Sequence, residues 1–125
     1  MESYERWKFG TDNDKLVKLV LKGEKRATTS LYKEYILEGK ELPKVGDRSI
    51  ILFDDDSEAC LIENVEVIVT EFKNMTEELA FIEGEEDKSL EYYRREHIRI
   101  FKEIDSEFND SSKVVFEIFK VIEKF

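Results

Sequence analysis

Several residue types are scarce in this sequence, and each scarcity excludes a class of protein. The 125 residues include one cysteine, one proline and one histidine. A lone cysteine can form neither an internal disulfide nor a zinc site built from several cysteines. Because Cys60 stands in the apolar run of residues 59–62, we expect it to be buried and unreactive. There is also no glycine-rich phosphate loop and no alternation of strand and helix, which excludes Rossmann and P-loop folds.

Long apolar segments are absent as well. The longest apolar runs are far shorter than the roughly 20 residues that span a bilayer, so we expect no membrane partner. The first residues lack a basic segment followed by an apolar core, which is the pattern of a signal peptide. We therefore expect a cytoplasmic protein.

Charge of one sign predominates. Acidic residues number 30 and basic residues 20, for a formal net charge of -10. Tight binding to duplex nucleic acid normally needs several Lys or Arg side chains that neutralise phosphates. We therefore expect no duplex partner, although a local basic patch could still bind a single nucleotide or a short strand.

The composition is that of one folded domain. Hydrophobic residues make up 41% and aromatic residues 12% of the chain, enough for one core at this length. The sequence has no internal repeat and no low-complexity linker, and Pro43 lies in a loop that separates no two kinds of composition. We therefore expect a single domain over residues 1–125.

Apolar spacing predicts four helices. They cover approximately residues 12–22, 31–38, 74–82 and 89–104. Ser30 and Asn74 are the expected caps of the second and third helices, and Gly23 and Gly39 are expected to end the first and second. The segment between the first two helices is expected to be a turn.

Three other segments, residues 48–53, 59–72 and 113–124, have the composition of strands. In the second of them Val65, Val67 and Val69 alternate with other residues, which is typical of a strand with one solvent-facing side. Its length suggests a bend near residues 63–64. Strand pairs joined by short turns, with helices set apart from them, favour an α+β fold with a mostly antiparallel curved sheet.

Three segments carry a resemblance to a known family. They are residues 23–30 after a helix, residues 42–47 before a strand, and residues 83–94 leading into a helix, with His97 just beyond. Together and in this order they resemble the ASCH family, over nearly the whole chain. The resemblance implies a PUA-like curved antiparallel β-barrel flanked by helices.

The resemblance also implies a site. ASCH domains are linked to RNA through their kinship with PUA domains, and one hydrolase branch deacetylates N4-acetylcytidine with a Lys, a Thr three residues later and a downstream Glu. Lys25 and Thr28 keep that spacing, and the acidic residue falls on Glu83 or Glu85. The sequence departs from the family's other pattern, in which a Glu and an Arg stand where Thr28 and Ser30 are found here.

The chemistry of these residue types suits acyl transfer. A desolvated lysine amine can accept a proton near neutral pH, and a threonine hydroxyl becomes a nucleophile once a base takes its proton. We assign these roles to Lys25 and Thr28, with Glu83 or Glu85 as the acid/base. Residues three apart meet only if residues 25–28 are not extended. The alternative is an exposed lysine, a threonine in a turn, and an acidic run that is solvated surface ahead of a helix.

The helix at residues 89–104 supplies the expected substrate-binding residues. Tyr93, Arg94 and His97 could face Lys25 and contact a base or a phosphate. In the alternative interpretation His97 is a core histidine bonded to backbone, and the arginines pair with nearby glutamates. Trp7 and the neighbouring Phe9 are expected to pack an N-terminal arm onto the core.

The sequence therefore predicts a small hydrolase acting on an acylated pyrimidine nucleoside, with no cofactor and no metal. Two alternatives stay open: a non-catalytic ASCH module that binds RNA or a nucleotide, and a metal-dependent ribonuclease built on the acidic loop. The expected partner is a small nucleoside or nucleotide, or single-stranded RNA in the alternative. The sequence does not indicate an oligomeric state.

Overall fold

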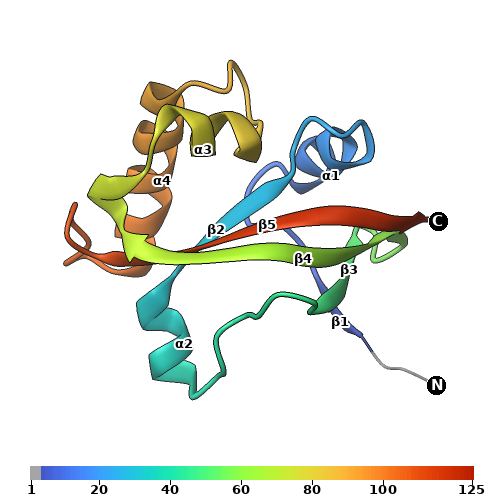
Figure 1. The fold of residues 1–125 in the computed structure, drawn as a ribbon, viewed down its shortest axis with the longest axis horizontal. Coiled ribbons are helices and arrows are strands. Elements are labelled where there is room, and N and C mark those ends of the chain that lie inside the picture. Colours follow the sequence, from blue (N-terminus) through green and yellow to red (C-terminus); the bar gives the residue numbers. More distant parts are fainter. Residues whose placement is uncertain (1–3) are drawn as a thin grey trace.

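A computed structural model describes residues 4–125 and shows one curled, five-stranded sheet with helices packed around it (Figure 1). In chain order the elements are β1 (Glu5–Trp7), α1 (Asn13–Leu21), β2 (Ala27–Leu31), α2 (Tyr32–Glu38), β3 (Arg48–Leu52), β4 (Glu58–Glu71), the 3₁₀ turn η1 (Phe72–Asn74), α3 (Glu77–Glu83), α4 (Leu90–Ile104) and β5 (Lys113–Lys124). The strand order is β1-β3-β4-β5-β2. The predicted PUA-like α+β fold is confirmed, as a half-barrel.

The sheet is mixed rather than wholly antiparallel. β1 pairs with β3 in parallel, and the other neighbouring strands are antiparallel. The long β4–β5 pairing is interrupted by register shifts between Leu61 and Ile62 and between Asn64 and Glu66. Such bulges bend a strand and increase its twist. They coincide with the bend predicted near residues 63–64, and they curl the sheet.

The valines of β4 lie in the sheet, as predicted, but two of them occupy its solvent-facing side. Val65 and Val69 are exposed, whereas Ile68 packs against the core.

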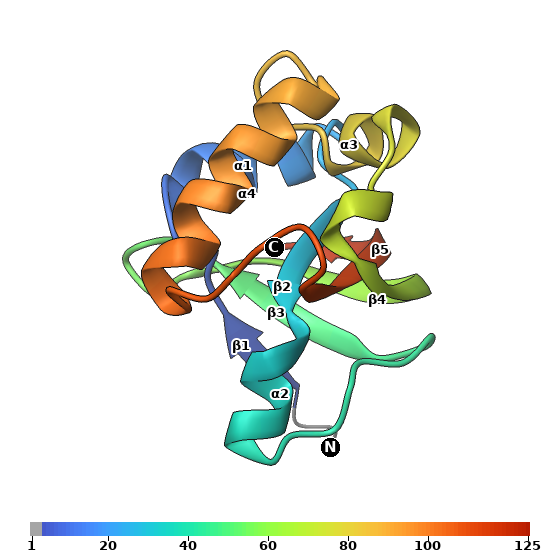
Figure 2. The ribbon, with the colours of Figure 1, turned by 90° about the vertical axis from the view of Figure 1, so that its left-hand side faces the viewer.

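Figures 1 and 2 show α1, α3 and α4 gathered on one side of the strands, with α2 at the far end of β2. Two hydrophobic clusters hold these layers together. One lies between α3, α4 and the strands β2 and β5, and includes Phe72, Tyr93, Phe101 and Phe116. The other lies under α1 and includes Cys60, which is buried as predicted. No helix within residues 4–125 has both the length and the apolar character needed to cross a membrane.

Two local predictions were wrong. Residues 27–31 form β2 rather than a turn, because they pair with β5 over Val114–Ile118. This strand has a polar middle and only its end residues, Ala27 and Leu31, are buried, so no alternating pattern identified it. As a result Ser30 lies in the strand, where its hydroxyl bonds that of Tyr35 at 2.8 Å, and does not cap a helix.

The cap of α3 also differs from the prediction. Its N-cap is Thr76, whose side chain accepts a hydrogen bond from the backbone N–H of Leu79. Asn74 instead belongs to η1 and donates to the Thr70 hydroxyl at 3.1 Å. Both residues are good capping types, and only the position where the preceding strand ends distinguishes them.

Candidate active site

Lys25 is the most unusual residue in the fold because its side chain is only 1% exposed. It lies between α1 and β2, where its backbone N–H donates to the carbonyl of Leu19 at 3.1 Å. Its amine donates to the Glu85 carboxylate at 2.7 Å and to the Glu83 carbonyl at 3.3 Å. A buried ammonium needs such partners, because an unpaired charge in the interior is strongly unfavourable.

Gly84 permits this close approach. It ends α3 in the left-handed region, with φ +76°. A β-carbon at this position would lie 1.9 Å from the backbone oxygen of Glu24 and 2.9 Å from the α-carbon of Lys25. Both its conformation and its contact with the neighbouring chain therefore require glycine. Gly84 therefore allows both candidate carboxylates, Glu83 and Glu85, to approach Lys25.

Glu83 is also almost fully buried, at 2% exposure. One carboxylate oxygen, Oε2, accepts a hydrogen bond from the Thr29 hydroxyl at 2.5 Å. The other, Oε1, lies 3.1 Å from His97 Nε2 and 3.9 Å from the Lys25 amine. Glu83 therefore lies between two basic groups and ties β2 to α4.

His97 completes this buried network. Its Nδ1 lies 2.7 Å from the backbone carbonyl of Tyr93, and its ring stacks on the Tyr93 ring at 4.1 Å. A carbonyl and an ionised carboxylate can only accept hydrogen bonds, so the ring donates from both nitrogens and carries a positive charge. The pKa of His97 is raised: burial alone would lower it, but the Glu83 charge outweighs that effect.

The surroundings shift the pKa values of the two carboxyl groups, Glu83 and Glu85, in opposite directions. Burial acts to raise the pKa of Glu83, but the charges of His97 and then Lys25 lower it well below its usual range. Burial raises the pKa of Glu85, an effect that the Lys25 charge opposes and the Glu83 charge reinforces. Glu83 therefore stays ionised, whereas Glu85 is the group of the pair suited to carry a proton.

A cavity of about 130 Å³ opens beside Glu85. Its walls come from the segment before α1, from β2, from the acidic loop and from α4, and include Phe9, Thr28, Thr29, Glu85, Tyr92 and His97. Burial, and then the charge of Glu96, raises the pKa of Tyr92 to about 12. The Tyr92 phenol therefore keeps its proton at neutral pH and can donate a hydrogen bond to a ligand.

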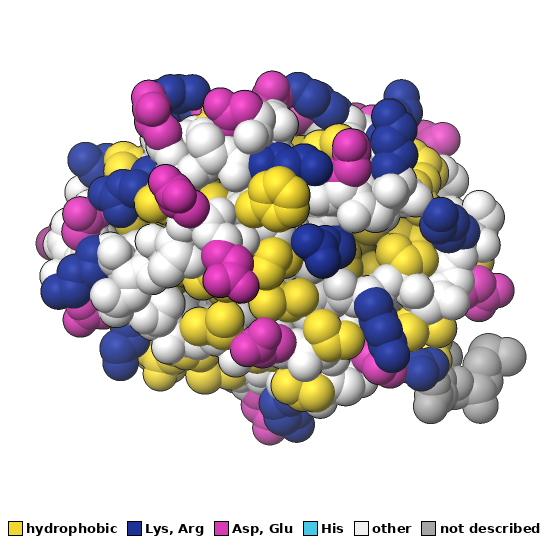
Figure 3. Space-filling model, turned by 45° about the horizontal axis from the view of Figure 1, so that its top comes forward, with side chains coloured by type: hydrophobic (Ala, Val, Ile, Leu, Met, Phe, Trp, Pro, Cys, Tyr) yellow, Lys and Arg dark blue, Asp and Glu magenta, His cyan; other side chains and the backbone are white. Residues whose placement is uncertain are grey.

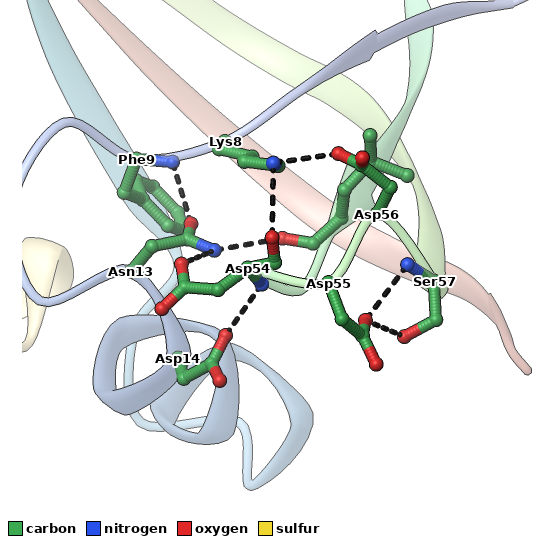
Figure 4. Close-up of polar contacts among 9 residues, drawn as sticks. Lys8, Phe9, Asn13, Asp14, Asp54, Asp55, Asp56 and Ser57 are labelled. Atoms are coloured by element: carbon green, nitrogen blue, oxygen red, sulfur yellow. Dashed lines mark hydrogen bonds and ion pairs between the residues drawn. The ribbon is translucent and has the colours of Figure 1, made fainter.

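Phe9 forms a wall of this cavity and lies over the Lys25 amine, 5.2 Å from ring centroid to nitrogen. Its position is fixed by the buried side chain of Asn13, which accepts a hydrogen bond from the backbone N–H of Phe9 at 2.7 Å. The Asn13 amide also donates to the Leu52 carbonyl at 2.9 Å and to Asp54 at 3.1 Å. Figure 4 shows this cluster joining the start of α1 to the β3–β4 turn.

Comparison with known proteins identifies the family. A profile of the ASCH domain matches residues 5–123. This chain belongs to the ASCH domain family. The ASCH domain of Lactobacillus crispatus JV V101 is 32% identical, with a TM-score of 0.89, over 95% of this chain and 79% of that one. A protein from Enterococcus faecalis V583 is 30% identical, with a TM-score of 0.91, over 99% and 79% of the two chains.

A more distant neighbour shows the fold alone. A variant of an ASCH protein from Zymomonas mobilis is 12% identical, with a TM-score of 0.57, over 98% of this chain and 73% of that one. A search of curated proteins found no match.

The ASCH fold brings most of the predicted site residues together. Lys25, Glu83, Glu85, Tyr93 and His97 lie in one network, as described above. Tyr93 and His97 form its buried side, with the Tyr93 hydroxyl 2.8 Å from that of Thr29. Of the three substrate-binding candidates, Tyr93, Arg94 and His97, only His97 lines the cavity.

Two of the predicted site residues, Arg94 and Thr28, lie outside this network. Arg94 pairs with Asp110 at 2.8 Å and lies over the Phe72 ring, away from Lys25. Thr28 lies in the extended strand β2 and lines the cavity, but within residues 4–125 the hydrogen bonds of Lys25 are to Glu83 and Glu85. The roles of Lys25 as base and Thr28 as nucleophile stay predictions.

Sequence reasoning missed three residues that build the site. Thr29, rather than Thr28, bonds the buried Glu83, and only the strand geometry of residues 27–31 shows which threonine faces the helices. Gly84 could have been suspected, because a glycine inside an acidic run suggests a close backbone approach. Phe9 was expected only to pack. It does form an edge-to-face pair with Trp7, whose indole N–H donates to the Ser49 hydroxyl at 2.9 Å.

A metal ion at this site would compete with Lys25 for the carboxylates of Glu83 and Glu85. Glu83, Glu85 and His97 can each offer a ligand atom, and these atoms lie within 4.8 Å of one another. The Lys25 ammonium, however, already lies 2.7 Å from Glu85 and 3.9 Å from Glu83. It supplies the positive charge that a cation would bring, and His97 already donates to Glu83. The donor set therefore fits an ion pair better than a divalent cation.

Proposed function

We propose that this ASCH domain is a small hydrolase that removes the acyl group from an acylated pyrimidine nucleoside such as N4-acetylcytidine. The observation that carries the proposal is the buried Lys25–Glu85 pair, 2.7 Å apart, of which Glu85 lines the same cavity as Thr28. A buried amine hydrogen-bonded to a carboxyl group, next to a hydroxyl and a small open cavity, supplies the components of acyl transfer. The family resemblance assigns the same three residue types to this chemistry.

The proposed reaction has two halves. In the first, the Thr28 hydroxyl attacks the acyl carbon while its proton passes to the Lys25 amine through a water molecule. The bond between the acyl carbon and the exocyclic nitrogen then breaks, and the leaving amine takes a proton from Glu85. In the second half, water attacks the acyl-threonine, which releases the carboxylic acid and restores the hydroxyl.

The raised pKa of Glu85 supports its part in this scheme. Burial is the main cause of that shift, and it favours the protonated carboxyl that a leaving amine requires. Glu83 then acts as a positioning residue, because its two carboxylate oxygens contact Thr29 and His97. The Tyr92 phenol is placed to donate a hydrogen bond to the acyl oxygen.

The experiment is deacylation of acylated cytidines by the purified wild type, Thr28→Val and Glu85→Gln. We expect turnover by the wild type and a loss of about two orders of magnitude or more in either variant. Mass spectrometry of quenched reactions should find one acyl group on the peptide containing Thr28. If the wild-type protein hydrolyses no acylated nucleoside, the proposal is refuted.

The non-catalytic alternative has an observation of its own. The Lys25 amine has two hydrogen-bond acceptors within residues 4–125 and lies over the Phe9 ring, which is also what a purely structural ion pair would show. In that case the cavity would bind a nucleoside without changing it. Wild-type turnover distinguishes the two functions.

A further inference from the structure

A second, larger cavity adjoins the small one. Its volume is about 760 Å³, within the usual range for ligand pockets. The two cavities share part of their walls: Phe9, Gly10, Thr28, Thr29, Ile100 and Phe101. A ligand whose acyl group lies in the small cavity can therefore extend into the larger one.

The larger cavity contains a half-buried carboxylate beside the candidate nucleophile. Glu117 in β5 is the direct cross-strand partner of Thr28 in β2, so their side chains lie on the same face of the sheet. Side chains paired in this way are about 5 Å apart at the β-carbon. Asn64, which is buried, donates its amide to Glu117 Oε1 at 2.9 Å. The other carboxylate oxygen can accept hydrogen bonds from a ligand.

The surroundings of Glu117 disfavour an anion. Burial raises the pKa of Glu117, the Asn64 hydrogen bond opposes that shift, and the nearby carboxylates of Asp47 and Glu5 add to it. Four basic side chains also line the cavity, but each forms an ion pair with a carboxylate: Lys8 with Asp56, Lys40 with Glu38, Lys44 with Glu41, and Arg48 with Glu63. A phosphate would meet negative charge on the cavity floor and cations that are already paired.

The floor of the larger cavity, around Glu117, can bind hydrogen-bond donors of a ligand. Next to Glu117 on the same wall, the hydroxyls of Ser30 and Tyr35 contact each other at 2.8 Å and also line the cavity. Carboxylate, amide and hydroxyl groups at such close range suit the hydroxyls of a sugar. The cavity therefore matches the uncharged half of a nucleoside better than a phosphorylated one.

We propose that Glu117, held by Asn64, binds the sugar hydroxyls of the ligand, so that the site selects a free nucleoside over a 5′-nucleotide or an RNA strand. This inference rests on the proposed function for the identity of the ligand. It adds the residue that determines which form of that ligand is accepted.

The test is calorimetric binding of cytidine and cytidine 5′-monophosphate at low ionic strength, where charge is least screened. We expect the wild type to bind cytidine about tenfold more tightly than the monophosphate. Glu117→Gln keeps an acceptor for Asn64 but removes the charge, so it should narrow that ratio to about threefold or less and weaken cytidine binding. Glu78→Gln removes a charge from an exposed position in α3, outside the walls of the cavity, and should leave the ratio unchanged. Thermal unfolding of each variant checks that it is folded.

The outcomes separate this inference from the hydrolase proposal, since turnover of acylated cytidine is measured on the same samples. A preference for cytidine without turnover supports the inference and removes the hydrolase. Turnover without that preference supports the hydrolase and overturns the inference. The inference is also overturned if the monophosphate binds as tightly as cytidine, if Glu117→Gln keeps the wild-type ratio, or if neither compound binds at millimolar concentration.

Discussion

Replacing Glu83 by glutamine should destabilise the fold strongly, although the side chain changes by a single atom. The substitution removes the negative charge that lies between the buried Lys25 and His97. Breaking a buried ion pair by removing one partner typically costs about 3–5 kcal/mol, because the other charge is left uncompensated. With a urea m-value of about 1.5 kcal/mol/M, a loss of 3 kcal/mol lowers the unfolding midpoint by about 2 M.

The same substitution should change how stability depends on pH. The pKa of Glu83 is lowered from 4.5, so its contribution is present above pH 4.5 and is lost as the pH falls through the folded value. The pKa of His97 is raised from 6.5, so its contribution is complete below pH 6.5 and is lost as the pH rises through the folded value. We expect the wild type to be most stabilised by this pair between about pH 4.5 and 6.5, and Glu83→Gln to lose both dependences.

The assay is urea unfolding followed by circular dichroism at a series of pH values. Glu78→Gln is the matched control, because Glu78 lies on the same helix but is exposed. Its unfolding midpoint should stay close to the wild-type value at every pH. A Glu83→Gln variant within about 0.5 kcal/mol of the wild type at pH 6 would refute the buried network as described.

Three further outcomes follow from the same geometry. Gly84→Ala should destabilise the protein by more than the usual 1 kcal/mol of a glycine substitution, because its β-carbon meets the Glu24 backbone, and unfolding curves measure this. Thr29→Val should lower stability by about 1–3 kcal/mol by leaving the buried Glu83 Oε2 without its donor, whereas Thr28→Val should unfold like the wild type while losing turnover; equal midpoints for the two would contradict the assignment. Duplex RNA should bind weakly at physiological salt, given a net charge of -10 and the interspersed Lys, Arg, Asp and Glu side chains of the face in Figure 3; a steep salt dependence with sub-micromolar affinity would contradict this.

The sequence predicted the long elements well because their patterns are strong and local. β5 has the predicted bounds of residues 113–124, and α4 begins one residue after its predicted start at residue 89. Ser89 is its cap, with a hydroxyl that accepts from the backbone N–H of Tyr92. The short strands β1 and β2 were missed because pairing with distant strands, rather than local pattern, creates them.

The candidate site was predictable in composition but not in geometry. Residue spacing and family resemblance selected Lys25, Glu83 and Glu85. They could not decide which carboxylate is buried, because that depends on Gly84 folding the acidic loop against residues 24–25. Nor could they show that Glu117, some 90 residues from Thr28 in the sequence, is its neighbour across the sheet.

The most direct test of the central claim compares the rates at which wild type and Lys25→Arg deacylate N4-acetylcytidine. Arginine keeps the positive charge beside Glu85 but does not give up its proton, so it cannot act as a base. Lys22→Arg makes the same change at an exposed position nearby and is the control. The account predicts that Lys25→Arg loses about two orders of magnitude or more in turnover while nucleoside binding changes less. Turnover by Lys25→Arg at the wild-type rate would contradict the role of Lys25 as the base.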